Sequence, residues 1–267
     1  MKNMAERTSK EYWEQFWEKN QDKSETKVLT NSQEMFALEI FSKYLPKSKE
    51  MKFIEIGCVP GEFLIDFHQN FDYQVAGIDL CDLKETENNL QHAGIKNYSL
   101  MQTNLDTFKT TEKYDIIGAF GFIEHFDQPE IQIKKMSELV GENGYLLLDI
   151  PNFRYLQYYL HKFLDRKDVF VAHNLKTMDL NVIREITEKN GWQTLFLSYY
   201  KPFNYWHNHK NWLMKIINLP ILALGFISNK IFTALHLNST LICKYTSPHI
   251  VYIGKKKSVD KSEQQTK

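Results

Sequence analysis

The stretch Phe53-Ile54-Glu55-Ile56-Gly57-Cys58-Val59-Pro60-Gly61-Glu62-Phe63 decides the fold. It begins inside a short apolar strand expected over 52–57, turns at two glycines, and enters a helix expected over 61–70. A glycine-bearing turn lets a ligand come close to the backbone. In doubly wound sheets, ligands bind outside the carboxyl ends of the strands, which is where such a turn lies. The stretch therefore predicts an α/β sheet with a binding site at its first turn.

Strands and helices continue to alternate after this turn. Further strands are expected at 74–80, 98–103, 115–120, 145–150, 192–199 and 249–254, and further helices at 82–93, 129–140 and 179–189. Short apolar strands that alternate with helices form a mostly parallel sheet with helices on both faces. We therefore predict a Rossmann-like α/β fold with seven strands, N-terminal helices and a helical insertion between the last two strands.

The chain divides into five expected parts. They are an N-terminal helical segment at 1–50, a Rossmann-like core at 51–200, a helical insertion at 201–246, a final strand at 247–256 and a disordered tail at 257–267.

The overall composition limits the classes of function. Hydrophobic residues make up 43% of the chain and charged residues 25%, which is ordinary for a globular protein. Lysine plus arginine equals aspartate plus glutamate at 33 each, so no whole-chain field attracts nucleic acid. The chain also lacks an N/D-P-P-Y tetrapeptide for a flipped base. Three cysteines without a CxxC pair, and an N-terminus without a signal-peptide pattern, predict reduced thiols in a cytoplasmic protein.

The first turn favours a ligand without phosphates. A dinucleotide template G-x-G-x-x-G that starts at Gly57 puts Val59 and Glu62 where glycines belong, and those glycines serve a pyrophosphate. Glu55 and Glu62 would add negative charge beside it. A nucleoside with a cationic end fits better, and S-adenosylmethionine (SAM) is such a molecule. Asp79, which closes the second expected strand, either accepts hydrogen bonds from ribose hydroxyls or caps the next helix.

Four short motifs occur in a fixed order at the expected strand ends. They are E-x-G-x-x-x-G at 55–61, Gly-Ile-Asp at 77–79, Tyr-Asp-Ile-Ile at 114–117 and Ile-Glu-His-Phe at 123–126. Together they resemble class I SAM-dependent methyltransferases, most closely the subgroup that includes ubiquinone-type and sugar or surface-polysaccharide O-methyltransferases. The resemblance covers residues 52–150 well and implies SAM as cofactor, with S-adenosylhomocysteine as product.

The resemblance also implies roles for ten residues around the cofactor. The methionine part lies at Glu55, Gly57, Cys58 and Gly61, the ribose at Asp79, the adenine at Leu80, Asn104 and Leu105, and the methionine end again at Phe120 and Gly121. Two features depart from the family pattern: Val59-Pro60 stands where smaller residues are usual, and Asn104 stands where aspartate is common.

Methyl transfer to a hydroxyl needs alignment and a base. His125, just after the fourth expected strand, and His173, after the fifth, are the catalytic candidates; the alternative for His125 is a structural histidine bonded to a backbone carbonyl. His207 and His209 have H-x-H spacing without a third ligand, so no metal site is predicted.

The acceptor is expected to be a small molecule or a sugar or polysaccharide precursor that is O-methylated. The alternatives are a prenylated quinone-type acceptor and a non-catalytic SAM-binding partner subunit. The insertion at 203–245 is aromatic and apolar, and its two apolar runs are too short to span a bilayer. It suits a cover over the acceptor pocket, a homodimer contact or peripheral contact with a membrane.

Overall fold

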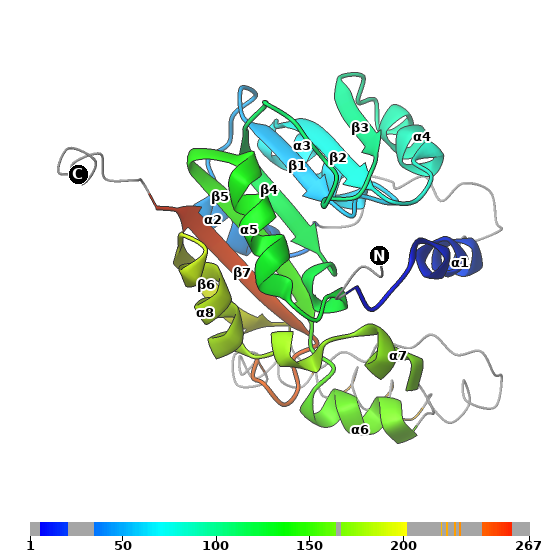
Figure 1. Ribbon diagram of the computed structural model, residues 1–267. Helices are drawn as coiled ribbons and strands as arrows, with labels where there is room; N and C mark the ends of the chain where they lie inside the picture. The colour runs from blue at the N-terminus through cyan, green and yellow to red at the C-terminus, as the bar shows by residue number, and fades with distance from the viewer. Residues whose placement is uncertain are drawn as a thin grey trace.

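A single seven-stranded sheet forms the centre of the protein (Figure 1). The computed structural model describes residues 6–20, 35–163, 167–201, 220, 223, 227, 230 and 242–257. The strands are β1 (Lys52–Ile56), β2 (Gln74–Asp79), β3 (Tyr98–Gln102), β4 (Tyr114–Phe120), β5 (Val140–Pro151), β6 (Trp192–Tyr200) and β7 (His249–Lys256). Their order across the sheet is β3-β2-β1-β4-β5-β7-β6.

The direction of the strands places the binding site. The first five strands pair in parallel, and β7 runs antiparallel between β5 and β6. The chain order reverses between β1 and β4, and ligands of open α/β sheets bind at such a switch point. The glycine turn at 57–61 follows β1 and therefore lies at this point.

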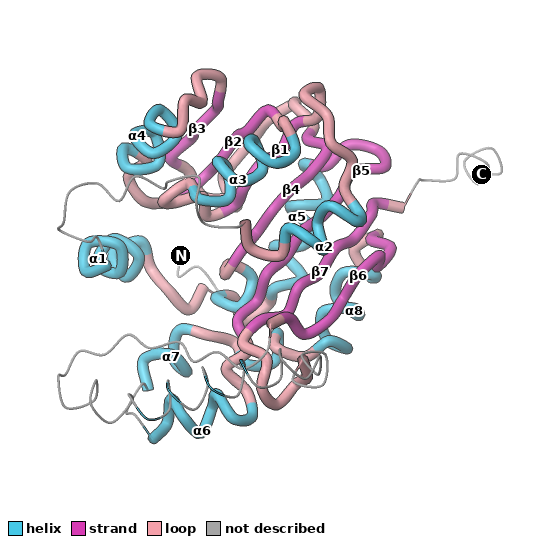
Figure 2. The backbone as a smooth tube through the Cα atoms, turned by 180° about the vertical axis from the view of Figure 1, so that it is seen from behind, coloured by secondary structure: helices cyan, strands magenta, loops and turns pink. Residues whose placement is uncertain are grey.

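Helices cover both faces of the sheet. The helices of the described residues are α1 (Lys10–Asn20), α2 (Leu38–Tyr44), α3 (Glu62–Phe71), α4 (Lys84–His92), α5 (Pro129–Leu139), α6 (Tyr155–Phe163), α7 (Lys167–Ala172) and α8 (Leu180–Lys189), with short 3₁₀ turns η1 (Ile123–His125) and η2 (Leu175–Thr177). Of these, α1, α6 and α7 lie beyond the ends of the strands rather than on a face (Figure 1). Figure 1 shows α5 and α8 in front of the sheet, and Figure 2 shows α2 and α3 on the opposite face.

Each face has its own apolar core. On one face, Ile133 and Met136 of α5 and Ile183 of α8 are fully buried against the sheet. On the other face, Phe41 of α2 and Phe67 of α3 are fully buried. Burial of such side chains contributes about 1.5–3 kcal/mol each, so the two cores hold the strand ends of the site in place.

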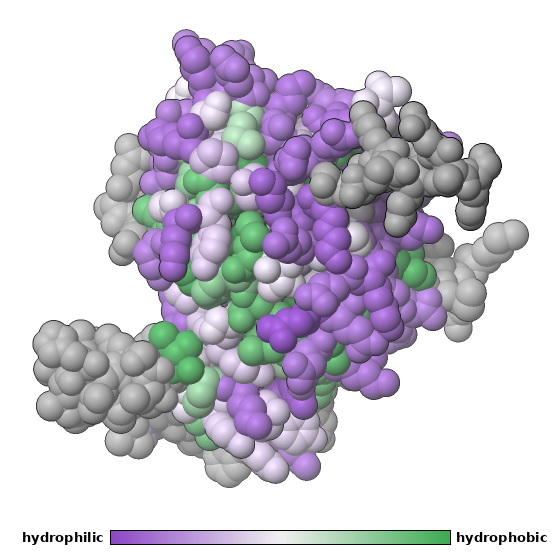
Figure 3. Space-filling model, turned by 90° about the vertical axis from the view of Figure 1, so that its left-hand side faces the viewer, coloured by the Kyte–Doolittle hydropathy of each residue, from purple (hydrophilic) through white to green (hydrophobic). Residues whose placement is uncertain are grey.

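The edge strand β6 leaves one side of the sheet half exposed. Most of its side chains are only partly buried, and the side view in Figure 3 shows apolar surface gathered in the middle of a mainly hydrophilic face. Among the described residues, no helix is both long enough and apolar enough to span a bilayer.

The predicted Rossmann-like fold with seven mostly parallel strands is confirmed. Most boundaries agree within two residues, and the largest difference is at β5, which begins at Val140 rather than Tyr145 because Val140 pairs with Tyr114 before the register shifts. In the N-terminal segment, α1 and α2 are helical, whereas residues 45–50 are not. Most of the insertion at 201–246, including His207 and His209, and the tail after residue 257 lie outside the described residues.

Candidate active site

A cavity of about 1290 Å³ opens at the carboxyl ends of the parallel strands. Ligand pockets in proteins usually measure roughly 300–1,000 Å³, so this one has room for a cofactor and an acceptor together. All twelve residues predicted from the sequence line it: Glu55, Gly57, Cys58, Gly61, Asp79, Leu80, Asn104, Leu105, Phe120, Gly121, His125 and His173. The fold therefore gathers residues from the ends of five segments into one site.

The glycine turn needs its glycines. Gly57 has φ of 78° and Gly61 has φ of 97°, in the left-handed region that other residues rarely adopt. A Cβ atom on Gly61 would also lie 2.9 Å from the Thr86 methyl carbon. Between the two glycines, the peptide bond before Pro60 is cis.

Cys58 anchors the turn to the neighbouring strand. Its thiol lies so close to Gly77 of β2 that a Cβ atom there would be 2.6 Å from Sγ. Burial is the main cause that raises the pKa of this thiol well above its usual value. The side chain therefore packs beneath the turn, and only its backbone is suited to contact a ligand.

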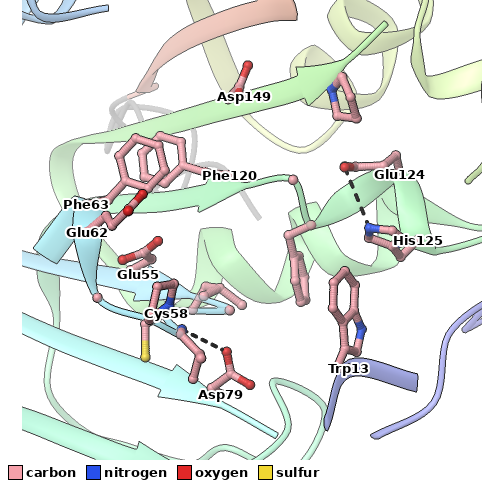
Figure 4. Close-up of a pocket in the computed structure, with 18 of the residues that line it drawn as sticks. Trp13, Glu55, Cys58, Glu62, Phe63, Asp79, Phe120, Glu124, His125 and Asp149 are labelled. Carbon is pink, nitrogen blue, oxygen red and sulfur yellow. Dashed lines mark hydrogen bonds and ion pairs between the residues drawn. The ribbon is translucent and has the colours of Figure 1, made fainter. Parts of the chain in front are cut away.

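Asp79 connects the turn to the cavity (Figure 4). Its carboxylate accepts hydrogen bonds from the backbone N–H of Val59 at 3.1 Å and of Cys81 at 2.8 Å. Burial raises its pKa, and these hydrogen bonds partly oppose that shift. The N-cap position of α4 belongs to Leu83, so Asp79 does not cap that helix.

The end of the cavity at the glycine turn is acidic. Glu55 is 3% exposed, and its Oε2 has no hydrogen-bond partner. Burial first, and then the carboxylates of Asp79, Glu62 and Asp66, raise its pKa well above the usual value. Burial and Glu62 raise the pKa of Asp66 to about 6. Lys201 is the single lysine or arginine among the described residues that line the cavity, so this end favours a cation.

The loop after β3 contributes an apolar surface and one side-chain amide, that of Asn104, to the cavity wall. Leu105 is buried, and Leu80 lines the same region. The side-chain oxygen of Asn104 accepts the backbone N–H of Asp106 at 2.8 Å, and its carbonyl accepts that of Phe108 at 2.8 Å. Asn104 thus builds the loop as well as facing the cavity.

The end of β4 combines backbone contacts with an aromatic wall. The N–H of Gly121 donates to the carbonyl of Asp149 at 2.9 Å, and the Gly121 backbone also contacts the ring of His125. The ring of Phe120 stacks on Phe63 with centroids 3.9 Å apart, as Figure 4 shows.

The two predicted catalytic histidines lie together. Their ring centroids are 4.5 Å apart, although His125 belongs to η1 and His173 follows α7. Nδ1 of His125 is hydrogen-bonded to the carbonyl of Ala172 at 2.9 Å, and the same residue lines the cavity. The structural contact and the position in the site, which were alternatives for His125, therefore occur together. Burial, followed by the neighbouring His173, lowers the pKa of His125 to about 3, and its ring is therefore neutral near pH 7.

Several cavity residues were not among the sequence predictions. Glu124 is fully buried beside His125, and His249 of β7 lies 3.0 Å from a carboxylate oxygen of Asp149 of β5. Trp13 of α1 makes an edge contact with His125, with centroids 4.8 Å apart. Glu124 could have been found from the sequence, because it is part of the Ile-Glu-His-Phe motif. No local signal in the sequence predicts that Asp149 and His249 are in contact.

The comparisons with known proteins agree with this architecture. Residues 31–197, more than half of the chain, match the family model of the methyltransferase domain. No curated protein matches the sequence. Among solved structures, a putative methyltransferase from Bacillus halodurans superposes with a TM-score of 0.58 at 13% identity, over 83% of this chain and 99% of that one.

Two further structures carry the product of SAM. A phosphoethanolamine N-methyltransferase from Haemonchus contortus, in complex with S-adenosylhomocysteine, has a TM-score of 0.52 at 14% identity, over 83% of this chain and 52% of that one. A mycolic acid cyclopropane synthase complexed with the same compound has a TM-score of 0.52 at 16% identity, over 82% of both chains. The protein belongs to the methyltransferase domain family, and the cofactor expected from its sequence is the one whose product these two structures hold.

Proposed function

We propose that the protein transfers the methyl group of SAM to a hydroxyl oxygen of a small molecule or a sugar or polysaccharide precursor. One observation carries the proposal: a single cavity joins an acidic end at a glycine turn to an aromatic end that contains histidines. The first end suits the cationic cofactor, and the second has room and chemistry for an acceptor.

The cofactor pose follows from the charges and the apolar surface after β3. The ammonium group lies against Glu55, where it pairs with a buried carboxylate that otherwise lacks a partner at Oε2. The ribose hydroxyls donate to Asp79, and the adenine packs on Leu80 and Leu105. The second lone pair of the Asn104 amide oxygen accepts the adenine amino group.

The acceptor lies under the aromatic face of α1. Trp13, Phe16 and Trp17 all line the cavity, and consecutive rings among them make edge contacts. Aromatic side chains offer large, stiff surfaces that pack on the flat face of a ring. This wall supports an acceptor with a ring, either a sugar or an aromatic compound.

The hydroxyl proton needs a destination during transfer. As the bond from the acceptor oxygen to the methyl carbon forms, the sulfonium–methyl bond breaks and the O–H proton leaves. His125, with a pKa of about 3, is a weak proton acceptor near neutral pH, so we assign it and His173 to contact with the acceptor. His249 receives the proton, because the Asp149 carboxylate holds its Nδ1 and fixes the ring for this role.

A methyl-transfer assay tests the proposal. The purified protein is first shown to bind SAM by calorimetry and is then incubated with SAM and a panel of nucleotide sugars, lipid-linked glycans and quinone precursors. Formation of S-adenosylhomocysteine together with an O-methylated acceptor supports the proposal, and methylation at a nitrogen or carbon atom contradicts it. O-methylation confined to prenylated quinone precursors would favour the alternative acceptor class. SAM binding without transfer to any acceptor would instead favour a non-catalytic partner subunit.

A further inference from the structure

A buried carboxylate without a hydrogen-bond partner lies beside two histidines at the acceptor end. Glu124 is fully buried, and neither of its carboxylate oxygens has a hydrogen-bond partner. An ionised carboxylate in such a place is strongly unfavourable unless a cation compensates its charge. The neighbouring Asp149 repels it further. The environment of Glu124 thus calls for positive charge.

The side chains around Glu124 have the spacing of metal ligands. One ligand atom each from Glu124, His125 and His173 lie within 4.8 Å of one another. Oε1 of Glu124 is 3.8 Å from Nε2 of His125, and Figure 4 shows the two groups facing each other. A small contraction brings such atoms to the distances of about 2.0–2.2 Å from a shared ion that histidine nitrogens and carboxylate oxygens adopt.

Both histidines have a backbone carbonyl beside Nδ1. Nδ1 of His125 lies 2.9 Å from the carbonyl of Ala172, and Nδ1 of His173 lies 2.6 Å from the carbonyl of Val169. A carbonyl only accepts hydrogen bonds, so a neutral ring that keeps its hydrogen on Nδ1 offers the lone pair of Nε2 to a metal; for His125 this requires release of its second backbone contact, to Gly121. Metal-binding histidines are oriented by such outer contacts.

The backbone fixes the two segments relative to each other. The N–H of Asn174, next to His173, donates to the carbonyl of Glu124 at 2.6 Å, and its side-chain amide donates to the carbonyl of Phe126 at 2.9 Å. The turn after β4 and the turn after α7 are therefore joined directly beside the three side chains. This preorganisation lowers the cost of gathering ligands around an ion.

We propose that Glu124, His125 and His173 form a binding site for one divalent first-row transition-metal ion. Two imidazoles and one carboxylate suit zinc, cobalt, iron or nickel better than magnesium or calcium, which prefer oxygen ligands. All three residues line the cavity, so the ion keeps a coordination position open toward the acceptor. That this position holds the acceptor oxygen rests on the proposed function.

Metal binding is measured on the full chain without SAM or acceptor. The protein is treated with a chelator, dialysed and titrated with Zn²⁺ by calorimetry, and Co²⁺ is added to a second sample to record its visible absorption bands. We expect one ion per chain and cobalt bands that report nitrogen and oxygen ligands. Because neither SAM nor an acceptor is present, failure of the methyl-transfer proposal leaves this result intact.

Two variants remove single ligands, and a third is a matched control. Glu124→Gln and His173→Gln should each weaken Zn²⁺ binding by at least the roughly 10–100-fold that loss of an outer contact causes. His92→Gln should bind Zn²⁺ as the wild type does. His92 lies outside the cavity lining, but its Nδ1 bonds a carbonyl four residues earlier, as that of His173 does.

The wild-type titration decides the proposal even where a variant folds poorly. Absence of one-to-one binding in the wild-type protein would overturn the site. So would an unchanged Zn²⁺ affinity in a ligand variant whose circular dichroism matches the wild type, or an equal loss of affinity in His92→Gln.

Discussion

Replacing Glu55 with glutamine removes a negative charge from the cofactor end of the cavity and keeps the shape of the side chain. Glu55 is 3% exposed, its Oε2 lacks a partner, and three carboxylates repel it. In the protein without cofactor this buried carboxyl group destabilises the fold when it is ionised, whereas in the proposed complex it pairs with the SAM ammonium. The substitution should therefore stabilise the empty protein and weaken cofactor binding.

The stability effect has a definite sign with pH. Burial raises the folded-state pKa of Glu55 above the unfolded value of about 4.3, so the native state holds the proton longer than the unfolded chain. The protonated carboxyl of Glu55 therefore favours the folded state at low pH, and this contribution to the free energy of unfolding is lost as the pH rises from about 4.3 through the raised pKa. The glutamine in Glu55→Gln does not titrate, so the difference in stability between the variant and the wild type grows over the same pH range.

The size of both effects follows from the buried group. The glutamine amide is as polar as the protonated carboxyl, so the gain comes from the lost charge alone. It is about 1.4 kcal/mol for each pH unit by which the folded-state pKa, or the working pH if it is lower, exceeds the unfolded value, which corresponds to a rise in Tm of roughly 3–6 °C for a chain of this length. A hydrogen bond to a charged group contributes about 1.5–3 kcal/mol, so the Kd for SAM should rise about 10–150-fold.

Calorimetry in two forms measures both effects. Scanning calorimetry without SAM gives Tm at several pH values, and titration calorimetry at pH 7 gives the Kd for SAM. Glu62→Gln is the control, because Glu62 is an exposed carboxylate next to the same turn, and its stability should change by no more than about 0.5 kcal/mol. A glutamine variant that is less stable at pH 7, or that binds SAM as well as the wild type, would refute the reasoning.

Three further substitutions test other parts of the site. Asp79→Ala should raise the Kd for SAM about 10–150-fold through loss of a charged acceptor; unchanged affinity by calorimetry, with Asp79→Asn for comparison, would remove Asp79 from the ribose site. Gly57→Val should abolish SAM binding, because φ of 78° strains a branched residue and its Cβ would lie 3.4 Å from the Phe122 ring; normal titration curves would place the cofactor elsewhere. His249→Gln should lower kcat about 10²–10⁴-fold in the methyl-transfer assay while the Kd for SAM stays constant, and a full-rate variant would exclude His249 as the proton acceptor.

The sequence predicted which residues line the acidic end of the cavity because the signals there are local. Gly57 and Gly61 flank one turn, and Asp79 ends the next strand, so the period of the apolar residues is enough to place them at one edge of the sheet. The same logic located all seven strands. The helices α6 and α7 were not delimited, because the mixed apolar and charged residues around 155–172 carry no clear start or stop signal.

The acceptor half depends on contacts between distant segments. Asp149 and His249 are 100 residues apart and meet only because β7 inserts beside β5, which no spacing in the chain predicts. The sequence motif placed His125 after β4, but its contact with Trp13 depends on how α1 docks. No metal site was predicted, because the spacing of Glu124 and His173 fits no local ligand pattern.

The helix α1 is held beside the mouth of the cavity by a few contacts with the turn after β4. Just before the helix, Arg7 pairs with Asp127 at 2.7 Å and donates its backbone N–H to the carbonyl of His125, and within the helix Trp13 adds an edge contact. These contacts belong to an element that lies apart from the sheet, as Figure 2 shows, and their residues are in neither apolar core. Opening this end of the cavity therefore requires breaking them and leaves the pairing of the seven strands unchanged, which is how lids give access to enclosed sites.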